Sequence, residues 1–102
     1  MPSYGPVSAA KAALESHVRQ LAMELAPQGI AANTIRAGVT DTPALRKIPG
    51  SEKLIASALA RNPAGRLTLP EDVAEAVAVL VEAPVWLTGN VIGVDGGEDI
   101  VG

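Results

Sequence analysis

The sequence has no cysteine and almost no aromatic side chains. Its 102 residues include no Phe, one Trp, one Tyr and one His, while 48% are hydrophobic. Aromatic rings therefore cannot dominate the core. The absence of Cys excludes disulfides and thiolate metal sites, and with a single His we predict no metal site. A chain without Cys also fits a reducing compartment.

Strong charge of either sign is lacking as well. The net charge is −3 at pH 7 and the charges are not clustered, so we expect no nucleic-acid or anionic-membrane partner. The first residues lack the basic and apolar regions of a signal peptide. No uncharged apolar run reaches the length that spans a bilayer. We therefore expect a cytoplasmic protein with no membrane association.

The length has room for one small domain, and we predict a single domain over residues 1–102. A chain of this size buries only about two-thirds of its unfolded surface, so its margin of stability is thin.

The clearest predicted helix covers residues 8–25, where large apolar residues recur at spacings of three and four. Pro27 and Gly29 end it. The apolar stripe consists of Leu14, Val18, Leu21 and Leu25. Residues 30–37 follow as a short apolar segment flanked by Gly, which predicts a buried strand.

A helix followed by a buried strand is half of a parallel-sheet unit, so the fold class is predicted to be α/β. Residues 91–94 are predicted to be the second strand. Between the strands, a helix from Ser51 or Glu52 to Arg61 interrupts a long irregular connection. Such an arrangement suits a mobile lid, which we place at about residues 43–62.

A further helix is predicted to start within Thr68–Asp72, with Pro70 in its first turn, and to run to about Ala83. Thr68 is followed three residues on by Glu71, the pattern of a capping box. We interpret Glu71 and Asp72 as cap residues that complement the helix dipole, not as a catalytic carboxylate pair. The predicted buried face of this helix consists of Val73, Val77, Leu80 and Val81.

Tyr4 and Lys11 are the one pair of residues that suggests reagent chemistry. They lie two turns apart, so they share a helix face about 10 Å apart along the axis, and Lys11 leans back toward Tyr4. A nearby cation lowers the pKa of a phenol from its usual value of about 10, and the phenol can then protonate an oxyanion or enolate. The alternative is an aromatic near a helix start beside a solvated lysine, because a single Tyr/Lys pair is a weak signal.

Polar residues follow the predicted strand in the segment 38–42. Ligands of open α/β sheets lie outside the carboxyl ends of strands, so Thr40 and Thr42 could hydrogen-bond a polar ligand. The alternative is that these residues form local turn or cap hydrogen bonds.

Five motifs occur in a characteristic order. They are Tyr4-x6-Lys11 on a helix ending in Glu24-Leu-Ala-Pro-Gln-Gly-Ile30, Asn33-Thr-Ile-Arg-Ala-Gly38-Val-Thr-Asp-Thr42, Asn62-Pro-Ala-Gly-Arg66, Pro70-Glu-Asp-Val-Ala74, and Leu87-Thr-Gly-Asn-Val-Ile-Gly-Val-Asp-Gly-Gly97. Over essentially the whole chain this order resembles the C-terminal half of short-chain dehydrogenase/reductases. Most members carry Tyr-x3-Lys, but here Val7 stands four residues before Lys11. Tyr-x6-Lys is similar to the enoyl-acyl-carrier-protein reductase branch.

The resemblance implies roles for individual residues. Tyr4 would stabilise or protonate the enolate formed when hydride adds to an enoyl thioester. Lys11 would hold the nicotinamide ribose of NADH or NADPH and add positive charge. The loop of Gly38, Val39, Thr40 and Thr42 would contact the nicotinamide amide. Residues 43–62 would match the substrate-covering loop.

The resemblance also shows what is missing. Family members are more than twice as long, and their first half carries a Gly-rich turn that cradles the pyrophosphate. Gly93, Gly96 and Gly97 have no helix after them and cannot replace it. The upstream polar catalytic partner of the family is missing too. We therefore predict the C-terminal portion of a Rossmann-like doubly wound parallel sheet, with two short strands and three to four helices, and without the N-terminal dinucleotide-binding half.

Two functional hypotheses follow. The first is a reductase-family fragment whose ancestral activity is NAD(P)H-dependent reduction of an enoyl thioester; we do not expect the isolated chain to turn over. The alternative is a non-catalytic module for oligomerisation or partner binding. Because two strands leave an unpaired sheet edge, we expect a homo-oligomer or a complex with an N-terminal fragment. The acyl substrate and the choice between NADH and NADPH are open at this point.

Overall fold

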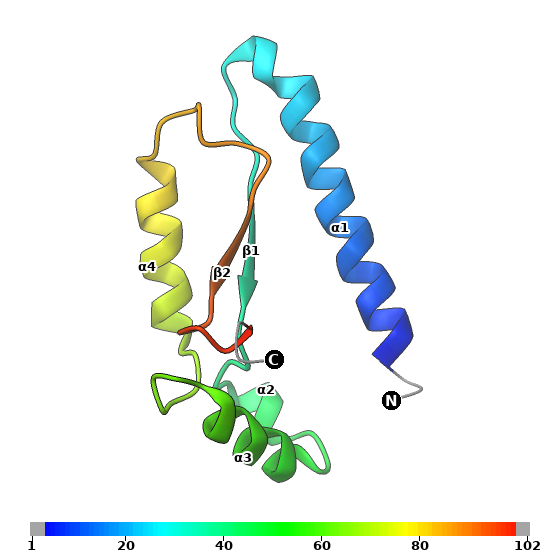
Figure 1. Cartoon of the computed structure of the whole chain (residues 1–102), viewed down its shortest axis with the longest axis vertical. Coiled ribbons are helices and arrows are strands. Elements are labelled where there is room, and N and C mark those ends of the chain that lie inside the picture. Colours follow the sequence, from blue (N-terminus) through cyan, green and yellow to red (C-terminus); the bar gives the residue numbers. More distant parts are fainter. Residues whose placement is uncertain (1–3, 100–102) are drawn as a thin grey trace. The chain divides into compact units, whose positions relative to one another are not determined.

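The computed structural model describes the backbone of residues 4–99 and the side chains of residues 9–99 (Figure 1). The elements, in chain order, are α1 (Tyr4–Leu25), a 3-10 turn η1 (Ala26–Gln28), β1 (Thr34–Ala37), α2 (Pro43–Arg46), α3 (Ser51–Arg61), α4 (Pro70–Val81) and β2 (Val91–Val94). The chain divides into two compact units, Met1–Thr34 with Ala83–Ile92 and Ile35–Glu82 with Gly93–Gly102.

The two strands form a parallel two-stranded sheet, which confirms the α/β class. The register follows from hydrogen bonds just outside the strands. Thr34 N–H donates to the Asn90 carbonyl at 2.9 Å, and Gly38 N–H donates to the Val94 carbonyl at 3.3 Å. Within the described residues each strand has one strand neighbour. Each strand therefore keeps one edge open for a further strand.

The first strand is shorter than the sequence predicted, because β1 begins four residues after Ile30. The backbone before it is held by a turn near the other end of the chain. Ala32 N–H donates to the Thr88 hydroxyl at 3.0 Å, and Gly89 N–H donates to the Ala32 carbonyl at 2.8 Å. These bonds replace a strand ladder. The second strand has the predicted bounds.

Helix α1 begins at Tyr4, four residues earlier than predicted. Pro6 is compatible with this start, because the first four N–H groups of a helix have no partner within the helix. Along the apolar stripe, Leu14 and Leu21 remain 55% and 45% exposed. Among residues 9–25 of α1, Ala22 is the buried one. The turn at Gly89 contacts it, since a Cβ at Gly89 would lie 3.6 Å from the Ala22 Cβ.

The predicted helix over residues 51–61 is confirmed as α3, in which Ala58 is fully buried. The segment before it is more regular than expected, since α2 occupies Pro43–Arg46. Thr42 caps this single turn, because its hydroxyl accepts a hydrogen bond from Leu45 N–H at 3.1 Å. Pro at the first helical position has the φ that a helix start needs.

Helix α4 starts at Pro70, within the predicted start segment, but its cap differs. The N-cap residue is Leu69, and the Asp72 carboxylate accepts from Leu69 N–H at 2.7 Å. The capping box predicted from Thr68 and Glu71 is wrong by one residue. Thr68 is buried, and its backbone pairs with Thr40 in an isolated parallel bridge, so it is held outside the helix.

The predicted buried face of α4 is only half correct. Val73 and Leu80 are half-buried, whereas Val77 and Val81 are 44% and 75% exposed. The helix ends at Val81, two residues before the predicted end at Ala83.

Few apolar side chains are buried among the described residues. Over residues 9–99 the buried hydrophobic residues are Ala22, Ala58 and Leu67, and no large side chain is fully buried. Large hydrophobic side chains instead remain exposed on both units, including Leu14, Leu21, Met23, Leu54, Val77, Val81 and Trp86. No helix in the described part of the chain is long and apolar enough to cross a bilayer.

Candidate functional site

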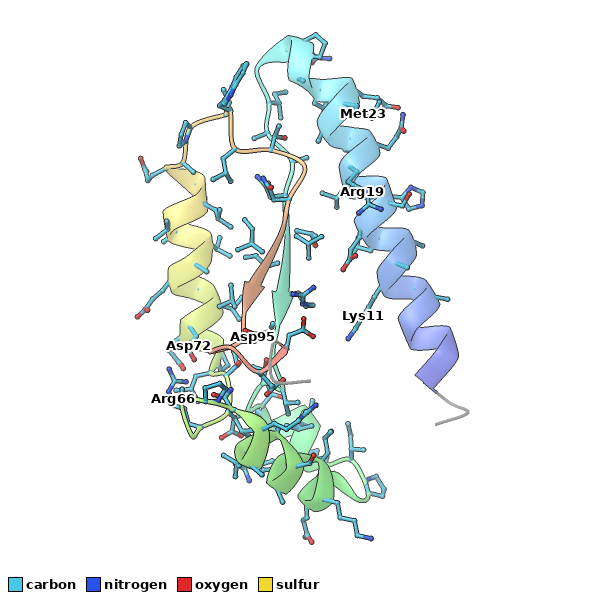
Figure 2. The ribbon with its side chains drawn as sticks, in the orientation of Figure 1. Lys11, Arg19, Met23, Arg66, Asp72 and Asp95 are labelled. Atoms are coloured by element: carbon cyan, nitrogen blue, oxygen red, sulfur yellow. The ribbon has the colours of Figure 1, made fainter. Side chains whose placement is uncertain are left out.

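The candidate catalytic pair lies on the first turns of α1. Tyr4 opens the helix, and Lys11 follows two turns later on the same face. The Lys11 side chain is exposed and extends outward from the helix (Figure 2). The Tyr4 side chain lies outside the described residues, so the geometry of the pair stays a prediction. Gly38, Val39, Thr40 and Thr42 share one loop of the second unit, whereas Lys11 belongs to the first unit.

The loop 38–42 continues the direction of β1 and is paired along its backbone. Thr68 N–H donates to the Val39 carbonyl at 3.1 Å, and Asp41 N–H donates to the Thr68 carbonyl at 2.8 Å. Val39 N–H donates to the Glu98 carboxylate at 3.1 Å. Thr68 and Glu98, which lie outside the loop in sequence, therefore hold its backbone in addition to the loop's own turn.

Both candidate threonines make local hydrogen bonds. The Thr40 hydroxyl donates to the Gly38 carbonyl at 2.8 Å, while the Thr42 hydroxyl accepts from Leu45 N–H at 3.1 Å. These are the turn and cap bonds of the alternative interpretation. Each hydroxyl keeps some hydrogen-bonding capacity: the Thr42 hydroxyl can still donate a hydrogen bond, and the Thr40 hydroxyl can still accept one.

Asp41, near the end of the loop, forms an ion pair with Arg46 of α2. Arg46 Nε and Nη2 donate to the two oxygens of Asp41 at 2.8 and 3.0 Å. These hydrogen bonds, and then the positive charge of Arg46, hold the pKa of Asp41 below its usual value. Asp41 is therefore an ionised partner of Arg46 and a poor candidate for a general acid.

A polar pocket of about 340 Å³ lies within the second unit. Its lining comes from the turn after α3, the start of α4 and the end of β2. The Asn62 side chain bridges two of these segments, because its amide donates to the Asp95 carbonyl at 2.9 Å and its oxygen accepts from Ala64 N–H at 2.8 Å. Asn62 thus gives the Asn62–Arg66 motif a structural role that sequence reasoning left unassigned.

Arg66 and Asp72 point toward each other at this pocket (Figure 2). Arg66 donates to both oxygens of Asp72 at 2.7 and 2.9 Å. These bonds, together with Leu69 N–H, lower the pKa of Asp72 to about 2. The pair therefore supports the interpretation of Asp72 as a structural carboxylate. In the part of the chain that the structure describes, no group of three His, Asp or Glu could hold a metal ion.

Glu98 is a residue of this region that sequence reasoning missed. It is buried, and its carboxylate binds Val39 N–H. The sequence holds no local signal for this contact, since the partners are 59 positions apart.

Comparison with known proteins identifies the family. The sequence profile described as enoyl-(acyl carrier protein) reductase matches residues 1–98. The chain is 41% identical over 91 residues to cis-4-hydroxycyclohexanecarboxylate dehydrogenase of Sinomonas cyclohexanicum, covering 88% of this chain and 36% of that protein. It is 36% identical over 101 residues to the NADH enoyl-[acyl-carrier-protein] reductase FabI of Escherichia coli, covering 98% and 38%.

A solved structure agrees with these matches. The NADH enoyl-[acyl-carrier-protein] reductase of Aquifex aeolicus superposes with a TM-score of 0.82 at 38% identity, covering 98% of this chain and 39% of that one. The chain thus spans somewhat over a third of the length of these relatives. Its two strands and four α-helices are confirmed as a portion of their fold. The chain belongs to the enoyl-(acyl carrier protein) reductase family of short-chain dehydrogenase/reductases.

Proposed function

We propose that this chain is the nicotinamide- and substrate-binding portion of an oxidoreductase that reduces an enoyl thioester with NADH or NADPH. The observation that carries this proposal is the family match over residues 1–98, which includes Tyr4-x6-Lys11 at the start of a helix. The acyl group is of the fatty-acid or polyketide type.

In the proposed reduction, different residues of the chain have different roles. When bound, the cofactor supplies a hydride to the carbon β to the thioester carbonyl. The Tyr4 phenol stabilises or protonates the enolate that results, and the Lys11 ammonium holds the ribose and lowers the pKa of the phenol. Gly38, Val39 and the two threonines would contact the nicotinamide amide.

One feature of the loop fits such a group. The Thr42 hydroxyl accepts one hydrogen bond and keeps its proton for another acceptor.

Turnover requires the dinucleotide-binding half of the fold. We propose that this half, as a separate segment or chain, adds a strand to the open sheet edge and covers the exposed apolar side chains of α1. Leu14 and Leu21, at 55% and 45% exposure, support this.

A non-catalytic module that binds a second copy or another partner is the second candidate. The exposed valines of α4 and the small number of buried apolar residues favour it. In this case the chain binds no cofactor, with or without a complementary half.

The test is a titration of the purified chain with NADH and with NADPH, alone and mixed with the N-terminal half of the Escherichia coli reductase. Saturable binding in the mixture, and oxidation of the reduced nicotinamide only when an enoyl thioester is added, support the reductase. Absence of binding in both samples, with a stable homo-oligomer in sedimentation, supports the module.

A further inference from the structure

Asp41 is the more exposed of the two carboxylates at the loop after β1. Its side chain is 32% exposed. The other carboxylate, which accepts a hydrogen bond from Val39 N–H, belongs to Glu98, a residue that is only 8% exposed. Of the two groups, Asp41 is thus the one whose charge is open to ions and ligands in solution.

The backbone around Asp41 is held on both sides. Asp41 N–H donates to the Thr68 carbonyl at 2.8 Å, which ties the loop to the segment before α4. On the other side Thr42 caps α2, because its hydroxyl accepts from Leu45 N–H at 3.1 Å and its carbonyl accepts from Arg46 N–H at 3.2 Å. The carboxylate is therefore anchored next to Thr42, which the proposed function places at the cofactor.

Arg46, the last residue of α2, pairs with this carboxylate through two hydrogen bonds. Its Nε donates to Asp41 Oδ1 at 2.8 Å and its Nη2 to Oδ2 at 3.0 Å. These bonds hold the pKa of Asp41 below its usual value, so the carboxylate is charged at neutral pH and the guanidinium neutralises it. The Arg46 side chain is 57% exposed, and ion pairs this open to solvent contribute little to stability. The main consequence of the pair is therefore the charge that the loop presents.

That charge matters for the ligand of the proposed function. NADH and NADPH both carry a negatively charged pyrophosphate, which one ribose separates from the nicotinamide. At physiological ionic strength, charges in water act on one another over about 8 Å, a distance comparable with the span of a ribose. A carboxylate without a partner on the loop that holds the nicotinamide would therefore repel the pyrophosphate.

We propose that Arg46 is a positioning residue that acts through Asp41: by neutralising this carboxylate, it allows an anionic dinucleotide to bind at loop 38–42. This inference rests on the proposed function, which places the nicotinamide amide at the loop. Removal of the arginine leaves Asp41 negative and weakens binding, whereas removal of the aspartate leaves Arg46 positive and strengthens it.

The experiment measures dinucleotide affinity in the full chain mixed with the N-terminal half of the Escherichia coli reductase. The probe is NADH or NADPH, whichever the wild type binds more tightly. At low salt, Arg46→Gln is expected to bind about fivefold more weakly than the wild type and Asp41→Asn about fivefold more tightly, which is the Coulomb effect of one charge near a pyrophosphate in water. At high salt both differences should shrink, because mobile ions screen exposed charges.

Two further variants control for changes in structure. The double variant Asp41→Asn with Arg46→Gln removes both charges and should bind within about twofold of the wild type. Arg66→Gln breaks the equivalent two-bond pair with Asp72, which lies outside the loop, and should also bind like the wild type. If the pair only stiffened the loop, either single substitution would weaken binding, and the double variant would bind no better than they do.

Opposite effects of the two single substitutions on affinity support the inference. Any other pattern, including weaker binding by both or no change in either, overturns it while the cofactor role of the loop stands. If the wild type binds neither dinucleotide in the mixture, the proposed function fails and this inference fails with it. Urea midpoints of the Asp41 and Arg46 variants should stay close to that of the wild type, which separates a change in charge from a loss of folding.

Discussion

The start of α1 and the loop after β1 differ in how their polar groups are held. Lys11 is exposed on a helix surface. In the loop, backbone and side-chain groups of Gly38–Thr42 are bound by Thr68, Leu45, Arg46 and Glu98. The first region thus presents a side chain to solvent, whereas the second presents a backbone held in one shape by other residues.

The largest expected effect is on activity and comes from the first region. In the chain mixed with a complementary N-terminal half, Tyr4→Phe should lower the rate of enoyl thioester reduction about a hundredfold, because the proton donor is lost. Urea unfolding should not change. The matched control is Trp86→Leu, which removes the other aromatic ring, 94% exposed. Full activity of Tyr4→Phe would show that Tyr4 is not the proton donor.

The second effect is on stability and comes from the loop. In Gly38→Ala, the new Cβ would lie 2.8 Å from the Thr68 hydroxyl and 3.0 Å from the Asp95 Cβ, which should lower the free energy of unfolding by about 2 kcal/mol. Gly93→Ala is the control, since its Cβ would meet its nearest neighbour at 3.5 Å. Equal urea midpoints for the two variants would show that the loop accommodates a Cβ at residue 38 without loss of stability.

A smaller loss is expected at the cap of α2. Thr42→Ala removes the acceptor for Leu45 N–H, and a lost N-cap typically costs about 1 kcal/mol. Thr42→Ser keeps the hydroxyl and should restore the wild-type midpoint in urea. If serine fails to restore it, the methyl group of Thr42, and not its hydrogen bond, is what matters.

The smallest effect is a pH dependence at Asp72. Its pKa is lowered from 3.8 to about 2 by Arg66 and by Leu69 N–H. Because the pKa of Asp72 is lower in the folded state than in the unfolded state, its ionised carboxylate stabilises the fold at any pH above the unfolded-state pKa. This contribution to stability is lost as the pH falls through the folded-state pKa. Between about pH 4 and 2, the wild type should therefore lose more stability than Asp72→Asn, as measured by urea midpoints. Glu82→Gln serves as the control and should follow the wild type; parallel curves for all three would contradict the ion pair.

Local signals were sufficient for most element positions. The apolar spacing of α1, the Pro at the start of α4 and the short apolar run of β2 each act within a few residues, so the sequence predicted their positions closely. Errors arose where a distant segment competes for the backbone. Residues 30–33 bond the turn at Thr88 and Gly89 in place of a strand, and Thr68 pairs with Thr40 in place of capping α4.

Ordered motifs and residue types along the chain were enough to predict the family, the α/β class and the candidate residues from Tyr4 to Thr42. The hydrogen-bond partners of the polar side chains became known only from the folded chain. Asp72 caps α4 and pairs with Arg66, and Glu98 reaches Val39 across 59 positions. Contacts at such separation depend on how the chain folds back on itself, and no local pattern encodes them.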